Sequence, residues 1–212
     1  MAEVIIDDND INDMTNGIGI FVDIRENTPT ANIRVTNNRI GTGNFGTTPG
    51  NVGGTRDGVF IQADDTQPKT LNVLFTDNTI HVTNTGSGTT GDQAVVIKGD
   101  DNGCTVNATV HGNTILQGAG GTGDLVFEAE QASTLCLDLN AGNVGADANS
   151  AATGIVLERE ATATFHVEGM GAGPNNNATV EAFLDPRNNN HVLSPVGDGF
   201  TNNGGAGCPT PP

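Results

Sequence analysis

The chain has 212 residues, a formal net charge of −17 and neither Trp nor Tyr. Eight Lys and Arg against 25 Asp and Glu leave no basic stripe to displace counterions from nucleic-acid phosphates. The same excess disfavours an anionic membrane surface, and no apolar run reaches the roughly 18 residues that span a bilayer. Nucleic acid and direct membrane insertion are therefore not expected, whereas the acidity favours solubility and divalent cations.

The first recurring motif along the chain is a short strand followed by a turn. It has two apolar residues at alternate positions, a polar turn, an Asn, one free position and an Ile. The Asn residues are Asn9, Asn38, Asn78 and Asn113, and the matching isoleucines are Ile11, Ile40, Ile80 and Ile115. A weaker fifth copy ends at Asn143, where the apolar positions shift by one residue and no Ile follows. Fixed strands joined by loops of variable length are typical of a solenoid.

The repeated Asn has a physical reason in such a fold. An amide side chain carries both a donor and an acceptor, so identical Asn side chains on successive coils can hydrogen-bond along the stack. Turns also tolerate Asn because its side chain mimics turn hydrogen bonds. We therefore expect a structural asparagine ladder with an inward stack of isoleucines beside it, and the alternative is a ligand-binding role for these asparagines.

A second recurring strand contains three consecutive apolar residues. Its copies begin at Ile20, Val59, Val95, Leu125 and Ile155. Alternate residues of a strand face opposite ways, so three in a row cannot all enter the core. The middle residues should form an outward apolar row, namely Phe21, Phe60, Val96, Val126 and Val156. Either the chain's own loops and tail cover this row, or it is an intermolecular or interdomain interface.

The repeat pattern ends after Val167. A Gly- and Asn-rich linker follows, and the sequence predicts a short helix over 178–185 with Asn177 as its cap. An open solenoid end exposes core residues and strand edges, so a terminal cap is expected. Residues 191–196 and Phe200 are expected to close this end.

These patterns predict an all-β fold. We expect a right-handed parallel β-helix of about five coils over residues 1–173, followed by a small cap with a short helix and an irregular tail over 174–212. Because the first motif begins at Val4, we also expect residue 1 to lie inside a larger parent polypeptide whose export signal is elsewhere.

Four segments carry a resemblance to a known family. They are the strand of Cys136 that ends in Asn143, T-F-H-V-E-G-M-G at 164–171, V-E-A-F-L at 180–184 and G-G-A-G-C-P-T-P at 204–211. Together they resemble the C-terminal end of large bacterial β-strand-repeat surface proteins. The resemblance covers most of the chain and concerns architecture. It implies secretion and a cell-surface, adhesin-like setting, and it brings no catalytic residues.

The three cysteines cannot all pair within one chain. Cys104 and Cys136 lie on consecutive predicted coils, nine and seven residues before the Asn of their motif, with the same side-chain parity. Two interpretations stay open, a disulfide between these two residues or buried free thiols.

Acidic residues gather in equivalent turns after the three-residue apolar strands. Asp64 and Asp65 follow one of these strands, and Asp100 and Asp101 follow the next. Turn chemistry explains them structurally. If the turns stack, however, four carboxylates would come together, and calcium could bind there with oxygen ligands. No calcium-loop motif is present, and the four histidines lack zinc-ligand spacing.

Three functional hypotheses remain. The leading one is a non-catalytic structural or adhesive segment of a secreted or cell-surface protein that contacts a surface glycan or protein. The second is a polysaccharide lyase or glycoside hydrolase, although the lack of Trp and Tyr platforms argues against sugar binding. A self-assembling filament or layer component is the third. Carboxylates converging on an open sheet face would favour the enzyme, since glycoside hydrolysis needs such a group.

Overall fold

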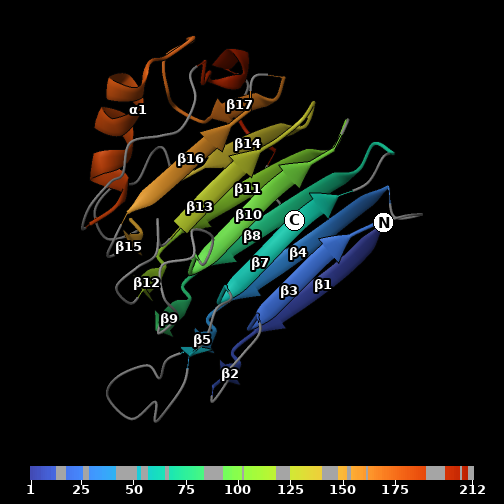
Figure 1. Cartoon of the computed structure of the whole chain (residues 1–212), viewed down its shortest axis with the longest axis vertical. Helices are drawn as coiled ribbons and strands as arrows, with labels where there is room; N and C mark the ends of the chain where they lie inside the picture. The colour runs from blue at the N-terminus through green and yellow to red at the C-terminus, as the bar shows by residue number, and fades with distance from the viewer. Residues whose placement is uncertain are drawn as a thin grey trace.

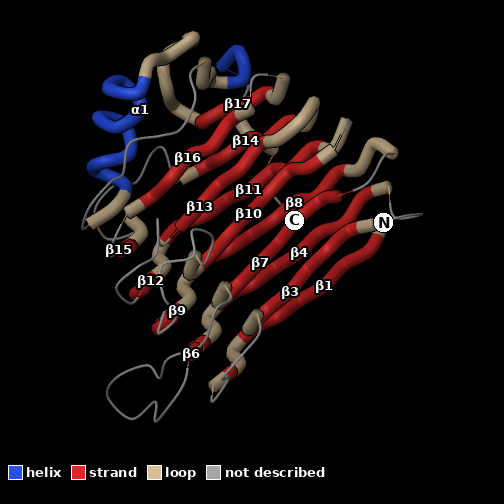
Figure 2. The backbone as a smooth tube through the Cα atoms, in the orientation of Figure 1, coloured by secondary structure: helices blue, strands red, loops and turns tan. Residues whose placement is uncertain are grey.

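The computed structural model describes most of the chain, and the strands it contains form three parallel sheets (Figure 1). The described residues are 1–12, 18–25, 29–41, 52–53, 57–64, 67–83, 93–101, 103–117, 125–139, 148–151, 154–160, 162–189, 199–205 and 207–209. Strands dominate these ranges (Figure 2). They contain one α-helix and two short 3₁₀ turns. The expected all-β class with parallel sheets is confirmed.

We name the sheets A, B and C. Sheet A contains β1 (Ala2–Asp7), β4 (Thr30–Thr36), β8 (Thr70–Thr76), β11 (Thr105–His111), β14 (Thr134–Asp138) and β17 (Thr164–Val167). Sheet B contains β2 (Asp10–Ile11), β5 (Arg39–Ile40), β9 (Thr79–Thr83), β12 (Thr114–Gln117) and β15 (Ser150–Ala151), with β6 (Val52–Gly53) also paired to β9. Sheet C contains β3 (Ile20–Ile24), β7 (Val59–Asp64), β10 (Val95–Asp100), β13 (Leu125–Ala129) and β16 (Ile155–Arg159).

The chain visits the sheets in a constant order, A then B then C, and each such set of strands is called a repeat below. Neighbouring strands pair in register, so equivalent residues of successive repeats lie side by side. Val4, for example, is the partner of Ile33, which is the partner of Val73. This arrangement fits a repeating parallel β-fold, in which each repeat contacts only its neighbours.

The turn between sheets A and B has the same backbone in the first four repeats. The residue before the motif Asn has a positive φ each time, 54° at Asp8, 57° at Asn37, 59° at Asp77 and 68° at Gly112. Asn, Asp and Gly are the residues that adopt this left-handed conformation most readily. The recurring D-N, N-N and G-N pairs therefore fix where the chain leaves sheet A.

The motif asparagines form a hydrogen-bonded row through five repeats, called the asparagine ladder below. In its centre, the backbone N–H and the Nδ2 of Asn38 both donate to Oδ1 of Asn78 at 3.0 Å. Asn78 donates in the same way to Asn113, and Asn9 donates to Asn38. Each Nδ2 also donates to backbone carbonyls, so these side chains are satisfied although Asn38 and Asn78 are buried.

The fifth position of the ladder corrects the sequence prediction. Asn113 donates to Oδ1 of Asn149 at 2.9 Å from Nδ2. Asn143, the residue predicted for this position, lies outside the described residues. The weaker motif copy thus pointed to the wrong Asn because the segment that joins β14 to β15 is longer than the earlier turns.

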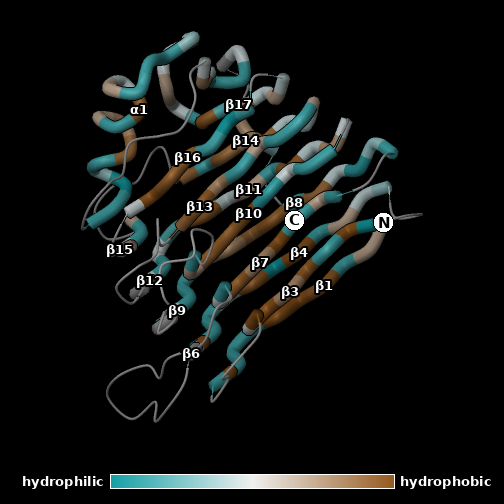
Figure 3. The backbone as a smooth tube through the Cα atoms, viewed as in Figure 1, coloured by the Kyte–Doolittle hydropathy of each residue, from teal (hydrophilic) through white to brown (hydrophobic). Residues whose placement is uncertain are grey.

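Between the sheets lies one continuous apolar core. The predicted isoleucine stack is part of it, since Ile40, Ile80 and Ile115 are fully buried and Ile11 packs against them from the open end. In the fifth repeat Ala151 takes the place of Ile. Apolar residues lie mainly along the strands, and polar residues lie mainly at the strand ends (Figure 3).

A second row of asparagines, not predicted from the sequence, lies on sheet A. Asn107 Nδ2 donates to Asn72 Oδ1 at 2.8 Å, and Asn72 donates to Asn32 at 2.9 Å. Further along, the same register position is taken by Cys136 and then His166. Sheet A therefore carries a polar row that ends at the C-terminal cap.

The C-terminal cap closes one end of the sheets. It contains α1 (Asn177–Leu184) and two short 3₁₀ turns, Asp185–Arg187 and Asn203–Gly205. Thr201 bridges to His166 of sheet A and Asn188 bridges to Asn149, so the cap continues two of the sheets. Its apolar residues Val180, Leu184 and Phe200 are fully buried in the main core. The cap lies at the opposite end of the stack from β1, β2 and β3 (Figure 1).

The helix of the cap begins close to its predicted position. Its cap residue is Asn176, not Asn177, and the Asn176 side chain accepts a hydrogen bond from the Thr179 N–H at 3.0 Å. Residues 191–196, also predicted to close this end, lie outside the described residues. No helix in the described ranges has the length and apolarity needed to cross a membrane.

The disulfide joins Cys136 to Cys208. Of the two interpretations left open by the sequence, the Cys104–Cys136 bond is therefore wrong, and the buried thiol holds for Cys104 but not for Cys136. Cys136 pairs in register with Asn107, which lies three residues beyond Cys104 on the neighbouring repeat. Three strand residues span roughly 10 Å, which exceeds the Cα–Cα separation of a disulfide. Cys104 is buried in the core, whereas Cys208 ties the tail to sheet A.

The ladder makes a direct stability prediction for Asn78. Asn78→Leu removes the acceptor of two Asn38 donors and the donor to three acceptors. Because each orphaned buried polar group costs about 1–3 kcal/mol, we expect the free energy of unfolding to fall by at least about 3 kcal/mol. Chemical denaturation measures the change. Asn189→Ala, at an exposed Asn, should change it little; equal losses in the two variants would contradict a buried ladder.

The disulfide makes a second prediction. Peptide mapping without reduction should recover Cys136 linked to Cys208, with Cys104 as a thiol. Cys208→Ser should lower the free energy of unfolding by about 2–5 kcal/mol and speed amide exchange first in the cap. Recovery of a Cys104–Cys136 peptide would show that the pairing is wrong.

Candidate functional site

The outward face of sheet C gathers most of the charged side chains that contact one another. Because its strands pair in register, this face carries three rows that run across the repeats. The first is the predicted apolar row of Phe21, Phe60, Val96, Val126 and Val156. Two residues further along each strand comes a polar row of Asp23, Gln62, Lys98, Glu128 and Glu158. The third row continues at the strand ends with Arg25, Asp64, Asp100, Glu130 and Glu160.

The apolar row is covered along only part of its length. Val96, Val126 and Val156 are at most 5% exposed and form a small cluster separate from the main core, with Phe60 packed against it. The chain itself therefore covers these three valines. At the other end Phe21 is 54% exposed, with its ring centroid 5.8 Å from that of Phe60. The row as a whole is thus not an open interface.

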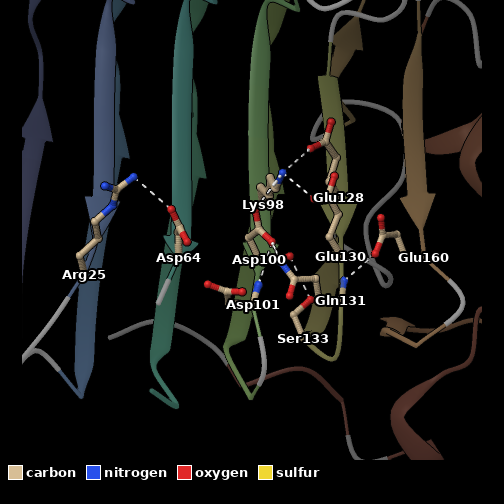
Figure 4. Close-up of polar contacts among 11 residues, drawn as sticks. Arg25, Asp64, Lys98, Asp100, Asp101, Glu128, Glu130, Gln131, Ser133 and Glu160 are labelled. Carbon is tan, nitrogen blue, oxygen red and sulfur yellow. Dashed lines mark hydrogen bonds and ion pairs between the residues drawn. The ribbon is translucent and has the colours of Figure 1, made fainter. Parts of the chain in front are cut away.

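Lys98 is the centre of the charged cluster (Figure 4). Its Nζ lies 2.8 Å from Glu130 Oε2, 3.2 Å from Asp100 Oδ2 and 3.8 Å from Glu128 Oε2. The Lys98 side chain is only 15% exposed. Burial alone would lower the pKa of Lys98, but the three carboxylates raise it above its usual value. Lys98 is therefore an ammonium ion at neutral pH and a poor general base.

Glu128 is the most perturbed carboxyl of this cluster. Burial raises its pKa to about 7, with a further increase from Glu158 and Glu130 that Lys98 opposes. The in-register neighbour Glu158 also has a raised pKa, again chiefly from burial. Adjacent parallel strands place these two like charges one strand apart. Glu128 can therefore hold a proton close to neutral pH.

The turn after β13 forms hydrogen bonds with the repeats on both sides of it. Gln131 has a positive φ of 52°, and its Nε2 donates to Asp100 Oδ1 at 2.9 Å. Its backbone N–H donates to Glu160 Oε2 at 2.8 Å. Ser133 donates to the Gly99 carbonyl oxygen at 2.9 Å. Two of these contacts hold the carboxylates of Asp100 and Glu160 in place.

Two of the four carboxylates predicted to bind calcium, those of Asp64 and Asp100, have cationic partners. Asp64 and Asp100 are register partners, as the sequence suggested. Asp64 Oδ2 lies 3.0 Å from an Arg25 guanidinium nitrogen, Asp100 contacts Lys98, and the Asp101 N–H donates to Asp100 Oδ1 at 2.8 Å. Asp65 lies outside the described residues. Within the described ranges no group of three or more His, Cys, Asp or Glu has metal-binding geometry, and the calcium site stays a prediction.

Sequence reasoning missed Lys98, Glu128, Glu130 and Glu158. A signal for them was present, because each is three or five residues after the start of its apolar triplet. In-register pairing of the triplets would have aligned them. The repeat motif was defined by its apolar positions alone, and the charged residues that follow each triplet were not compared between repeats.

The cluster contains some of the groups that acid–base catalysis needs. Glu128 could donate a proton near neutral pH, and Glu130 or Glu158 could act as a second carboxylate. The Glu128 side chain is only 13% exposed, however, and Lys98 forms ion pairs with the carboxylates of this cluster. The aromatic rings on this face are those of Phe21 and Phe60, which lack a polar edge.

Comparisons with protein-family models, with curated proteins and with solved structures found no match. The resemblance to bacterial β-strand-repeat surface proteins therefore stays a prediction.

Glu128 makes stability depend on pH. Its folded-state pKa of about 7 lies above the ordinary value of 4.5, so the folded state keeps a proton that the unfolded state releases between these values. The free energy of unfolding should fall as the pH rises from 4.5 to 7, by about 3 kcal/mol for a shift of this size. In Glu128→Gln this part of the pH dependence should disappear.

Chemical denaturation at pH 5.5 and pH 8 checks this expectation. Glu3→Gln is the matched control, since Glu3 is exposed on β1 and carries the same charge. The control should keep the wild-type slope between the two pH values. A Glu128→Gln slope equal to that of Glu3→Gln would contradict the assignment.

Proposed function

We propose that this chain is a right-handed parallel β-helix of about five coils that serves as a non-catalytic structural or adhesive segment of a secreted or cell-surface protein. The observation that carries the proposal is the unbroken asparagine ladder, which joins the five repeats and is buried at Asn38, Asn78, Asn113 and Asn149. A rod built in this way resists local opening because each rung satisfies the polar groups of the next.

The charged face of sheet C is consistent with a structural role. Stacked repeats bring side chains of equal charge together at one strand spacing, and Lys98 and Arg25 form ion pairs with some of them. Polar groups in a prepared catalytic site are instead directed at a reacting atom. In this cluster the charged groups are directed at each other.

The disulfide supports an extracellular location. Disulfides persist mainly in oxidising compartments, among them the bacterial periplasm and cell surfaces. Cys136–Cys208 ties the C-terminal tail to sheet A. A surface glycan or protein is the proposed partner class, and the residues that would contact it are left unassigned.

A second candidate function, polysaccharide processing, is favoured by one specific observation. Glu128, with a pKa of about 7, has two further glutamates, Glu130 and Glu158, as neighbours. This is the convergence of carboxylates that glycoside hydrolysis requires. This function is placed second for two reasons. Glu128 is only slightly exposed, and the ammonium of Lys98 lies at the centre of the charged cluster.

A panel of neutral and acidic polysaccharides distinguishes the two functions. The chain is incubated with each polymer, with calcium or with chelator, and both retention on the polymer and new chain ends are measured. The structural proposal predicts no new chain ends under any condition. Products that appear with wild type and disappear with a folded Glu128→Gln variant, but persist with Glu3→Gln, would establish the enzyme instead.

A further inference from the structure

Residues 199–205, called the hook below, continue sheet A at the capped end of the molecule (Figure 1). Thr201 pairs with His166 of β17 in a parallel bridge, and the Thr201 N–H donates to the Phe165 carbonyl oxygen at 3.1 Å. The fully buried ring of Phe200 has its centroid 5.2 Å from that of Phe165. The hook therefore covers both the edge of β17 and an apolar side chain of that strand.

The ring of His166 joins the hook to sheet A through one nitrogen atom. The Asn203 backbone N–H donates to His166 Nδ1 at 3.1 Å, and the Thr201 hydroxyl oxygen lies 2.6 Å from the same nitrogen. A backbone N–H can only donate, so Nδ1 must present its lone pair to it, and the proton of the neutral ring must be on Nε2. The Thr201 hydroxyl can rotate to donate to the same lone pair. The hook is therefore closed on a neutral His166.

The backbone of the hook turns sharply at this contact and is then fixed to sheet A a second time. Asn203 and Gly204 have positive φ values of 54° and 62°, a conformation that Asn and Gly adopt most readily. Further along, the Cys208 N–H donates to Glu168 Oε2 at 2.6 Å, and Cys208 is bonded to Cys136. A hook that opened would therefore stay attached to sheet A by a covalent bond.

A proton on His166 Nδ1 would turn an acceptor into a donor. The ring N–H and the Asn203 N–H would then face each other, and the hydrogen bond between them could not form. Burial lowers the pKa of His166, because the buried ring binds a proton less readily than an exposed one. The closed hook is thus favoured above the ordinary pKa of about 6.5, and this preference is lost as the pH falls below that value.

The elements that contact His166 bring two charged side chains near its ring. Glu168 follows two residues later on β17, and Asp138 follows two residues after Cys136, the register partner of His166 on β14. Asp138 interacts in turn with the Arg187 guanidinium of the cap. The hook itself contains no ionisable side chain. Both carboxylates would favour a protonated ring, but burial decides the direction of the pKa shift.

We propose that His166 is an acid-sensitive latch, whose protonation releases residues 199–205 and uncovers the edge of β17 while the disulfide keeps the released segment attached. The asparagine ladder takes no part in this opening, because amide side chains do not titrate in this range. The inference concerns the cap alone. It goes beyond the proposed structural or adhesive role and does not depend on it.

Two titrations of this molecule act in opposite directions, which separates them in an experiment. Protonation of Glu128, whose pKa is raised to about 7, stabilises the whole fold as the pH falls. Protonation of His166, whose pKa is lowered, loosens the hook as the pH falls. Faster local opening of the hook in acid, without faster opening of the ladder, is therefore the signature of the latch.

Hydrogen exchange of the full chain with its disulfide intact tests the proposal at pH 7.5 and pH 5. Exposure times are scaled to the intrinsic exchange rate at each pH. The amides of Val167 and Thr201 report on the hook, and the amide of Thr79, which donates to the Asn38 carbonyl oxygen, reports on the ladder. The opening constant at Val167 and Thr201 should rise by up to roughly thirtyfold, the limit reached when only the open form binds the proton. That of Thr79 should not rise.

Two matched variants give the test its specificity. In His166→Asn, the amide Oδ1 lies as many bonds from Cβ as Nδ1 does, accepts hydrogen bonds and binds no proton at these pH values. This variant should keep the hook closed at both pH values, and Asn fits the register position because earlier repeats have Asn32, Asn72 and Asn107 there. His111→Asn, on the same sheet but away from the hook, should retain the full acid response.

The nitrogen chemical shifts of the His166 ring add a readout that depends on no variant. At pH 7.5 the shift of Nδ1 should be that of an unprotonated nitrogen, and the shift of Nε2 that of a protonated one. Three results would overturn the proposal. They are unchanged opening of Val167 and Thr201 between the two pH values, an equal acid response in His166→Asn and wild type, and a proton on Nδ1 at pH 7.5.

Discussion

The row of buried asparagines is the interaction on which the rest of this structure depends. Each Asn satisfies the next one and the carbonyl groups of the turn, so a buried amide costs little only if every repeat places its Asn at the same height. That requirement fixes the register of the strands on both sides of the turn. Register then decides which side chains stack, because a shift of one residue would exchange the inward and outward faces.

In-register stacking also explains the charged face of sheet C. A parallel repeat places equivalent residues one strand apart, and in an acidic chain these residues tend to carry the same charge. Two features reduce the repulsion between these like charges. Lys98 lies among three carboxylates. Glu128 has a pKa raised to about 7, so it holds a proton near neutral pH. Burial is the main cause of the raised pKa of Glu128, and the stacked Glu158 and Glu130 raise it further. A perturbed pKa here has a structural cause and does not by itself indicate catalysis.

Much of the fold was predictable because its signals are local. The Asn–x–Ile motif and the apolar triplets each place one strand, and their recurrence predicts the parallel sheets that the structure contains. The fifth Asn was mispredicted because a longer segment separates β14 from β15, and the wrong frame at Asn143 also made Cys104 and Cys136 look aligned. Pairing of Cys136 with Cys208 depends on how the tail returns over sheet A, and no local pattern encodes that return. The contacts of Lys98 depend on the in-register alignment of neighbouring strands. They become predictable only when the charged residues after each apolar triplet are aligned between repeats.

Exchange of the Asn side-chain amide hydrogens tests the central claim most directly. In an NMR experiment that resolves individual Asn side chains, the Nδ2 hydrogens of Asn38, Asn78 and Asn113 should exchange with solvent only when the repeats unfold together. The exposed Asn189 provides the internal reference for rapid exchange. Protection of all three by a similar factor is the result that this account predicts. Exchange of any of them as fast as Asn189 in the folded protein would contradict a continuous buried ladder.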